Sequence, residues 1–582
     1  METVNVKING MSIDVPVGST ILEAARLAHI EIPTLCYLKE INAIGACRIC
    51  VVEVKGARSL VASCVYPVAE GMEIRTNTTK VLESRKKTLE LILSDHNRTC
   101  LSCVRSGSCE LQKLCNDLKV KDETLYEGER NEFEIDLSSA HMARDNSKCI
   151  LCRRCSAVCE HIQGIGVIGA NERGFRTNIS CAFDMGLGDT SCVSCGQCIV
   201  ACPTGALYEK DFTDEVFAAL NDPEKYVIVQ TAPAVRASLG EEFGLPIGTN
   251  VQGKMVSSLR RLGFDKVFDT DFAADLTIME EATEFIDRVQ NGGVLPLITS
   301  CSPGWIKYCE HYYPDMIENL STCKSPQQMF GAITKTYYAE KTGLNPENIV
   351  MVSVMPCTAK KFEIKRENQN AAGLPDVDIA ITTRELARMI ERTGLNFLAL
   401  PDEDFDDPLG RSTGAAVIFG ATGGVMEAAL RTAVETLTNS ELPSPDFSDV
   451  RGTEGIKKVT YHVAGMDVNV AVASGLVNAK ILLDEVKSGK SNYHFIEIMG
   501  CEGGCVTGGG QPIQPANVMN FTDIKSLRAK ALYDIDAAMP IRKSHENTSI
   551  KQLYDEYLEK PGSHKAHEIL HTSYVKRTVN SI

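Results

Sequence analysis

The chain has 582 residues, 44% of them hydrophobic and 23% charged, and its formal net charge is −16. Because a single core rarely grows beyond about 300 residues, this length predicts several domains. The acidic balance argues against general nucleic-acid binding, which needs a strongly basic face. The sequence does not open with a basic segment followed by an apolar one, and no apolar run approaches the roughly 18 residues that cross a bilayer. We therefore predict a cytoplasmic protein without a membrane partner.

Cysteine usage is the most informative feature of the composition. The chain contains 23 cysteines, and most of them stand in closely spaced groups. In a cytoplasmic protein such groups bind metal more often than they form disulfides. We therefore expect the N-terminal part of the chain to hold metal clusters.

The first predicted module begins with a hairpin. Residues 3–16 form two alternating segments around Asn9-Gly10, a dipeptide suited to a tight turn, and Thr20 and Glu23 can form the capping box of a following helix. Hairpin, helix and a cysteine loop together resemble a β-grasp ferredoxin domain with a 2Fe-2S cluster. The cysteine spacing differs from that of plant-type ferredoxins and is similar to the version in large respiratory-type subunits. The predicted ligands are Cys36, Cys47, Cys50 and Cys64.

The second group combines one histidine with three cysteines. These four residues can close around one 4Fe-4S cubane, with a neutral imidazole in place of one thiolate. A lone histidine is usually a solvent-facing helix residue, but its place just before three cysteines favours ligation. The exchange makes the cluster one charge less negative, which should raise its reduction potential. The predicted ligands are His96, Cys100, Cys103 and Cys109.

The third group follows a polar linker at residues 120–145 and repeats the spacing C-x2-C-x2-C-x3-C, the second time before Pro203. In this ferredoxin pattern the fourth cysteine of each run ligates the cluster of the other run. A zinc ribbon or disulfides are the alternatives, but zinc sites use separated CxxC pairs. We predict two 4Fe-4S clusters, one on Cys149, Cys152, Cys155 and Cys202 and the other on Cys192, Cys195, Cys198 and Cys159.

From about residue 210, short apolar runs alternate with amphipathic helices, which predicts parallel-type sheets covered on both faces. The predicted strands are 226–230, 294–298, 349–355, 377–381, 417–419, 468–472 and 495–498. Three strands lead directly to Cys301, Cys357 and Cys501. Since the carboxyl ends of parallel strands converge on one crevice, we expect one buried site there. The glycine-rich segment 419–424 lacks a full dinucleotide fingerprint and is interpreted as a strand-to-helix turn beside that site.

The predicted fold class is therefore α+β and multidomain. The four predicted domains are a β-grasp 2Fe-2S ferredoxin domain at 1–79, a 4Fe-4S domain with one histidine and three cysteine ligands at 80–125, a double 4Fe-4S ferredoxin-like domain at 126–209, and a large α/β catalytic domain at 210–582 with two parallel-type sheets around a buried metal site.

Three loops carry the chemistry, at 299–305, 355–363 and 497–510. They resemble the signature loops of the iron-only (FeFe) hydrogenases, and the upstream modules match that family's four accessory clusters. The resemblance covers essentially the whole chain. It implies reversible conversion of two protons and two electrons to dihydrogen. It also implies an H-cluster, which is a 4Fe-4S cubane joined to a diiron unit with CO, CN and azadithiolate ligands.

The resemblance assigns roles to individual residues of these loops. Cys357 and Cys501 would hold the cubane, and Cys505 would bridge cubane and diiron unit. Lys360 would donate a hydrogen bond to a cyanide nitrogen rather than extend into solvent. The two methionines that would pack soft sulfur against the diiron unit are Met355 and Met499.

The first loop departs from the family pattern of two adjacent cysteines, a proton relay followed by a cubane ligand. This chain has Cys301 followed by Ser302. Counting back from Cys357 without gaps puts Cys301 at the relay position and Ser302 at the ligand position. Serine is a poor iron ligand, so either the loop shifts and Cys301 ligates the cubane, or the cubane has an unusual fourth ligand. Cys301 is functional in both cases.

The proton path is also carried over from the family, onto Glu281, Glu284, Ser321 and Arg288. Glu281 and Glu284 share a helical face at i, i+3, as a relay requires. Without the resemblance, a charged surface helix is the preferred interpretation.

The leading prediction is a catalytic hydrogenase. Its expected partners are ferredoxin, alone or with flavin- and NAD-binding subunits of an electron-bifurcating complex, and maturation proteins for the diiron unit. One alternative is a non-catalytic electron-transfer subunit of an NADH-dehydrogenase-like complex, which has no reason to contain the three cysteine loops. The other is a hydrogen sensor, which usually adds a signalling domain.

Overall fold

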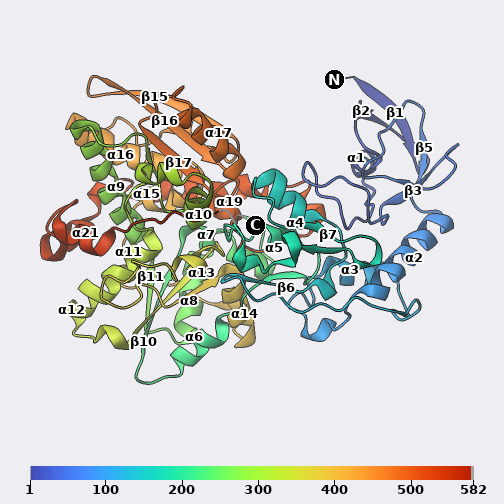
Figure 1. The fold of residues 1–582 in the computed structure, drawn as a ribbon, viewed down its shortest axis with the longest axis horizontal. Coiled ribbons are helices and arrows are strands. Elements are labelled where there is room, and N and C mark those ends of the chain that lie inside the picture. Colours follow the sequence, from blue (N-terminus) through green and yellow to red (C-terminus); the bar gives the residue numbers. More distant parts are fainter. Residues whose placement is uncertain (1, 579–582) are drawn as a thin grey trace.

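The structure is a computed structural model that describes residues 2–578. Figure 1 shows small modules built from the N-terminal part of the chain on one side and the large C-terminal domain on the other. The ferredoxin repeat, with α4 (Arg154–Ala157) and α5 (Gln197–Ala201), lies between them. Among the described residues, no helix is both long and apolar enough to span a membrane.

The N-terminal module is a five-stranded sheet in the order β2-β1-β5-β3-β4. Asn9 and Gly10 both adopt positive φ, as a two-residue hairpin turn requires, so the predicted hairpin forms. The predicted capping box is also present, with Thr20 and Glu23 bonding to each other's backbone N–H. The elements of the module are β1 (Thr3–Ile8), β2 (Met11–Pro16), α1 (Ile21–Leu27), β3 (Val51–Val54), β4 (Val61–Ala62) and β5 (Glu73–Arg75).

The middle of the chain has little regular structure and is built around its cysteine loops. Helices α2 (Thr79–Asp95) and α3 (Glu110–Asp117) precede the ferredoxin repeat. Two short antiparallel pairs frame that repeat, β6 (Met142–Arg144) with β9 (Leu207–Glu209) and β7 (Gly169–Asn171) with β8 (Asn178–Ser180). Within its two CxxCxxC loops Leu151, Arg153, Ser194 and Gly196 adopt positive φ, which folds each loop tightly around a common centre.

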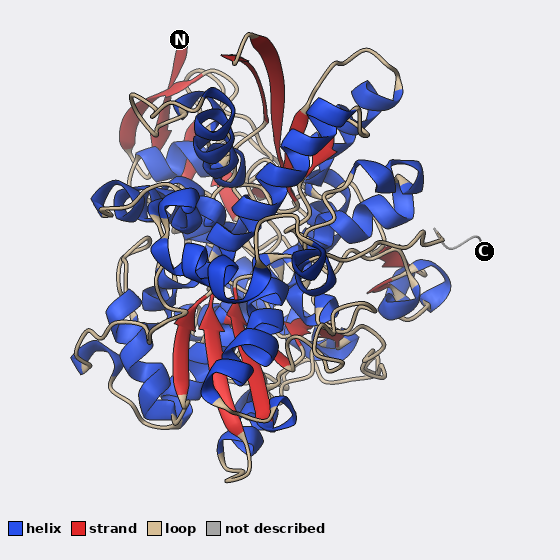
Figure 2. Cartoon of the chain, turned by 90° about the vertical axis from the view of Figure 1, so that its left-hand side faces the viewer, coloured by secondary structure: helices blue, strands red, loops and turns tan. Residues whose placement is uncertain are grey.

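The large domain contains two four-stranded sheets. The first has the order β11-β10-β13-β14 and is fully parallel, while the second, β12-β17-β16-β15, is parallel except for its β15–β16 edge. Successive residues of β10 enter different cores, since Ile228 packs with one cluster and Val229 with another. Figure 2 shows the strands enclosed by helices. The strands are β10 (Tyr226–Thr231), β11 (Lys266–Asp269), β12 (Leu297–Ile298), β13 (Ile349–Met355), β14 (Ile379–Thr382), β15 (Ile456–Val463), β16 (Met466–Ser474) and β17 (Phe495–Met499).

The helices that position the site come from several parts of the large domain. Helix α9 follows β11, α10 and α13 follow the first two cysteine loops, and α16 follows the glycine-rich segment. The site helices are α9 (Asp271–Asn291), α10 (Pro303–Tyr312), α13 (Lys360–Glu363), α16 (Gly424–Thr438), α18 (Ala516–Met519), α20 (Thr548–Leu553) and α21 (His564–Leu570).

One predicted strand is wrong. Residues 417–419 belong to α15 (Gly414–Val417) and the 3-10 turn that follows it, so the glycine-rich segment joins two helical elements rather than a strand and a helix. This segment is buried on all sides, and a short fully buried run has no periodicity that distinguishes helix from strand. The tight turn itself is present, because a Cβ on Gly423 would lie 2.0 Å from the carbonyl oxygen of Val450.

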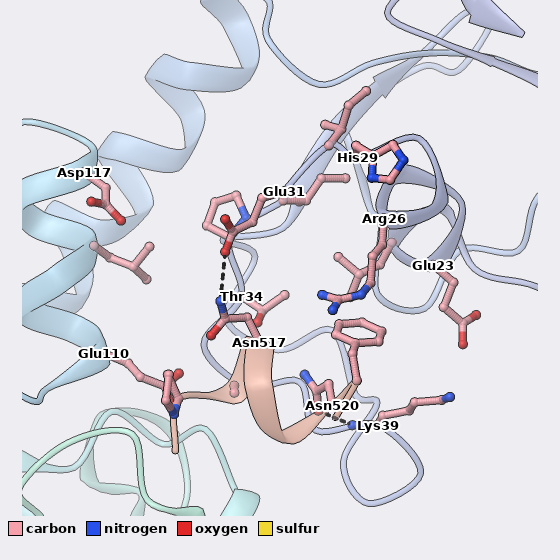
Figure 3. Close-up of a pocket in the computed structure, with 18 of the residues that line it drawn as sticks. Glu23, Arg26, His29, Glu31, Thr34, Lys39, Glu110, Asp117, Asn517 and Asn520 are labelled. Carbon is pink, nitrogen blue, oxygen red and sulfur yellow. Dashed lines mark hydrogen bonds between the residues drawn. The ribbon is translucent and has the colours of Figure 1, made fainter. Parts of the chain in front are cut away.

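The N-terminal module rests on the large domain beside a groove of about 1070 Å³ that α1, α3 and α18 border. Two contacts join the modules next to it. The Arg26 guanidinium lies 3.6 Å from the ring centroid of Phe521, and the backbone N–H of Lys39 donates to Asn520 Oδ1 at 2.8 Å. Figure 3 shows Arg26, Lys39 and Asn520 among the residues that line the groove.

Candidate functional site

The four cysteines of the N-terminal module lie together. Cys50 Sγ is 3.4 Å from Cys64 Sγ, and hydrogen bonds from Cys47 and Cys64 lower the pKa of Cys36. All four are free of disulfides. Four thiols in mutual contact, three of them buried, fit the ligand set of a 2Fe-2S cluster.

His96 is buried rather than solvent-facing, with 7% of its surface exposed. Burial lowers the pKa of its imidazole to about 4, so the ring is neutral at physiological pH. Its Nδ1 is buried and has no hydrogen-bond partner among the described residues. A neutral buried imidazole with an unpaired nitrogen fits a metal ligand.

The cysteines that follow His96 border the ferredoxin repeat. Cys109 Sγ lies 3.7 Å from the carbonyl oxygen of Pro203, and a Cβ on Gly205 would lie 2.5 Å from Cys103 Sγ. The group of one histidine and three cysteines is therefore adjacent in space to the next group of ligands along the chain.

The ferredoxin repeat forms two small cavities, each lined by four cysteines. The first cavity is lined by Cys149, Cys152, Cys155 and Cys202, and the second by Cys159, Cys192, Cys195 and Cys198. Each cavity thus takes its fourth cysteine from the other run. Two separate four-thiol cavities fit two cubanes better than a zinc ribbon.

The large domain brings three more cysteines to one buried site. Cys357 directly follows Pro356 at the end of β13, Cys501 follows β17, and Cys505 begins a 3-10 turn one loop further on. Burial and, to a smaller extent, the nearby Cys357 raise the pKa of the Cys505 thiol to about 12. The same two causes raise the pKa of Cys501. Three thiols from the loops after two separate strands, β13 and β17, therefore share one desolvated centre.

Cys301 and Ser302 point to different neighbours. Burial raises the pKa of the Cys301 thiol, followed by the charges of Glu281 and Cys505. Ser302 Oγ instead accepts a hydrogen bond from the Gly500 N–H at 3.2 Å. The serine therefore faces the loop that carries Cys501, and the cysteine faces the acidic side of the site.

Lys360 is buried, with 8% of its surface exposed, and is not a solvated lysine. Its Nζ donates to Glu363 Oε2 at 2.8 Å, to Ser325 Oγ at 2.9 Å and to the Cys301 carbonyl oxygen at 3.2 Å. The predicted methionines, Met355 and Met499, are each 2% exposed. The lysine therefore ties the second loop to the first.

The four predicted proton-path residues form a connected group. Burial raises the pKa of Glu281 to about 8, while a hydrogen bond from Ser321 lowers it in part. Ser321 Oγ also donates to Glu284 Oε2 at 3.4 Å, and Arg288 Nη2 donates to Glu284 Oε1 at 2.6 Å. Glu281 is 1% exposed, so the surface-helix interpretation of this position is wrong.

Sequence reasoning missed several polar residues of the site. Gln197 Nε2 donates to Cys501 Sγ at 3.2 Å, and its position between two cysteines of the repeat was the available signal. Burial raises the pKa of Glu497 to about 7, although this carboxylate accepts hydrogen bonds from the N–H groups of Gly423 and Met426. Glu363, which anchors Lys360, carried no signal beyond its place in the loop.

Fold and site together define a multidomain iron–sulfur protein with grouped cysteines in its N-terminal modules and a further cysteine centre in an α/β domain. Family models agree with this class along most of the chain. They match the iron only hydrogenase large subunit, C-terminal domain (225–509), the iron hydrogenase small subunit (522–577), a 2Fe-2S iron-sulfur cluster binding domain (1–79), the NADH-ubiquinone oxidoreductase-G iron-sulfur binding region (85–124) and a 4Fe-4S dicluster domain (148–206).

Curated relatives match over nearly the full length. The chain is 51% identical to the NADP-reducing hydrogenase subunit HndD of Solidesulfovibrio fructosivorans, over 99% of this chain and 100% of that protein. It is 45% identical to iron hydrogenase 1 of Clostridium pasteurianum, over 98% and 99%. The solved structure of a variant of apo [FeFe]-hydrogenase HydA1 from Chlamydomonas reinhardtii matches 63% of this chain and 99% of that one, with 43% identity and a TM-score of 0.57. The chain belongs to the iron-only hydrogenase family.

Proposed function

We propose that this chain catalyses the reversible reaction of two protons and two electrons to H2 at an H-cluster held by Cys357, Cys501 and Cys505. The observation that carries the proposal is the convergence of these three desolvated thiols from two loops, one that follows β13 and one that follows β17. When bound, the cluster supplies the redox-active metal at which protons and electrons combine. The protein residues hold it, exclude water and deliver protons.

Electrons would reach the centre through one 2Fe-2S and three 4Fe-4S accessory clusters, held in the first three of the four domains with the boundaries given above. The ferredoxin repeat packs directly on the catalytic loops, which supports this route. A Cβ on Gly509 would lie 2.2 Å from the Cys195 carbonyl oxygen, so only glycine allows the two backbones to approach this closely. Short distances between ligand loops favour electron transfer.

Protons would move along Cys301, Glu281, Ser321 and Glu284. Burial keeps the Glu281 carboxyl protonated up to about pH 8, so that it can both donate and accept near neutrality. Cys301 would exchange protons with it, because the two groups are electrostatic neighbours in the same buried space. Arg288 would position Glu284 through its 2.6 Å ion pair.

This assignment makes Cys301 a proton relay rather than a cubane ligand. Ser302, whose hydroxyl faces the Cys501 loop, would then stand at the corner where the family carries a cysteine. Lys360 would orient the first loop through its hydrogen bond to the Cys301 carbonyl oxygen. Its positive charge would interact with the diiron unit. Met355 and Met499 would line that unit with sulfur.

The partners follow from the relatives. Because HndD is named a subunit of an NADP-reducing hydrogenase, we infer that this chain works in the cytoplasm with flavin- and NAD(P)-binding subunits and with ferredoxin. Maturation proteins would supply the diiron unit. The nucleotide chemistry would be performed by the other subunits.

Infrared spectroscopy after anaerobic maturation tests the proposal. We expect bands in the CO and CN stretching region, H2 evolution with a chemical reductant, and loss of both in Cys505→Ala. A protein with full accessory-cluster iron but no such bands would be the non-catalytic electron-transfer subunit. Bands with turnover too slow to support metabolism would indicate a hydrogen sensor.

A further inference from the structure

A histidine pair at the C-terminal helix adjoins the outer end of the proton path. His571 Nδ1 lies 2.7 Å from Thr322 Oγ1, and the same hydroxyl lies 3.0 Å from Glu284 Oε2. The ring of His571 packs on that of His567, with centroids 4.0 Å apart. His571 has a side chain only 7% exposed, while His567 is exposed. Thr322, His571 and His567 therefore connect Glu284 to the surface.

Arg288 is poorly suited to be the exit itself. A guanidinium stays protonated in proteins and cannot accept and release protons near neutrality. Arg288 is also held in place, because besides Glu284 it donates to the carbonyl oxygens of Leu320, Glu318 and Val294. Imidazole, in contrast, gains and loses a proton in the physiological range.

We propose that His571, reached from Glu284 through Thr322, passes protons between the path and solvent by way of His567. In the outward step the Glu284 carboxyl proton moves to Thr322 Oγ1 while the Thr322 hydroxyl proton moves to His571 Nδ1. The products are a Glu284 carboxylate and an imidazolium on His571. The imidazolium then gives a proton to His567 or to water beside it, and His567 releases it to solvent.

The surroundings of His571 suit this role. Its Nε2 lies 3.2 Å from Glu280 Oε2, and this buried carboxylate also accepts hydrogen bonds from the Gly562 N–H and the Tyr554 hydroxyl. Glu280 and Glu284 on α9 therefore both face the ring, and Cys323 is the further titratable group beside it. A β-bridge between His571 and Cys323 holds the backbone of His571 beside the path.

The inference rests on the proposed proton path, so the test includes the path itself. H2 evolution with a chemical reductant is measured between pH 6 and 9 for His571→Gln, His567→Ala and Glu284→Gln. His564→Ala, an exposed histidine of the same helix, is the matched control. We expect the rate of H2 evolution in both histidine variants to fall about tenfold or more at pH 8 and by less at pH 6. Loss of an acid–base group typically lowers a rate 10²–10⁴-fold. Added imidazole should restore much of the loss in His567→Ala.

A second measurement does not depend on a loaded active site. Deuterium exchange at the imidazole C2 carbon, followed by mass spectrometry on protein without the diiron unit, reports the titration of each histidine. The pKa of His567 is lowered by burial and by the charge of His571, so its midpoint should rise in His571→Gln. An unchanged midpoint would overturn the pairing of the two rings.

The outcomes separate the two proposals. If Glu284→Gln keeps its activity, the proton path itself is wrong. If Glu284→Gln is inactive while both histidine variants match His564→Ala at every pH, the path stands and the histidine exit is refuted. Iron content and circular dichroism identify any variant that fails to fold. Because His567 lies at the surface, His567→Ala should disturb folding less than His571→Gln.

Discussion

Gln197 donates a hydrogen bond to the Sγ of Cys501, with an Nε2–Sγ distance of 3.2 Å, and a second one to the Thr507 carbonyl oxygen at 2.8 Å. The glutamine stands between Cys195 and Cys198 of the ferredoxin repeat, and Cys501 belongs to the catalytic loop. One side chain therefore joins the last accessory ligand set to the proposed cubane.

Replacing this donor should make the cubane harder to reduce. A hydrogen bond to a thiolate stabilises the more negative, reduced cluster, so Gln197→Met should lower the potential of the cubane. A bond of about 1–2 kcal/mol corresponds to roughly 40–80 mV for one electron. A redox titration followed by electron paramagnetic resonance measures the shift. The accessory clusters in the same titration are the internal control, and an equal shift in all of them would contradict the assignment.

Glu281 should limit proton delivery. Because its carboxyl is buried and bonded to Ser321, Glu281→Gln should reduce turnover by about 10²-fold or more while leaving the infrared bands intact. Asp287→Asn, an exposed carboxylate on the same helix, is the matched control. Retained turnover in Glu281→Gln would exclude this carboxyl from the path.

The same residue should make stability depend on pH. Its pKa in the folded chain is raised to about 8, mainly by burial, above the unfolded value of about 4.3. Folding therefore favours the neutral carboxyl over the carboxylate. The free energy of unfolding falls as pH rises from about 4.3 to about 8, because the group ionises more readily in the unfolded chain. Glu281→Gln cannot ionise and should be more stable than the parent at pH 8, by a few kcal/mol. Thermal unfolding should show a small difference between the two proteins at pH 5 and a much larger one at pH 8.

His96 should be required for one cluster. Its buried, unpaired Nδ1 predicts that His96→Ala loses about four iron atoms per chain, whereas His96→Cys keeps them and lowers the potential of that cluster. His161→Ala, at an exposed position, is the control. Iron content per chain and electron paramagnetic resonance measure the loss of the cluster. Unchanged iron content in His96→Ala would mean that His96 is not a cluster ligand.

Local patterns made the grouping of the cysteines predictable, because the spacing within one loop limits which thiols can lie together. The capping box of Thr20 and the turn at Asn9 were predictable for the same reason. Contacts between distant segments were not. Gln197 and Cys501 are 304 positions apart, and Thr322 and His571 are 249 apart. Such pairs depend on how the modules pack, which no local spacing encodes.

The position of Cys301 permits a direct test of its role. Its thiol is an electrostatic neighbour of Glu281 and Cys505, while Ser302 Oγ bonds to the Gly500 N–H. Cys301→Ala should therefore keep its iron and its CO and CN bands but lose about 10²–10⁴-fold in turnover, as expected for a lost acid–base group. Ser300→Ala, which removes a hydroxyl that donates to the Cys323 carbonyl oxygen and bonds to Tyr574, controls for disturbance of the loop. If Cys301 were instead a cubane ligand, its removal would cost iron and the infrared bands together, so iron content separates relay from ligand.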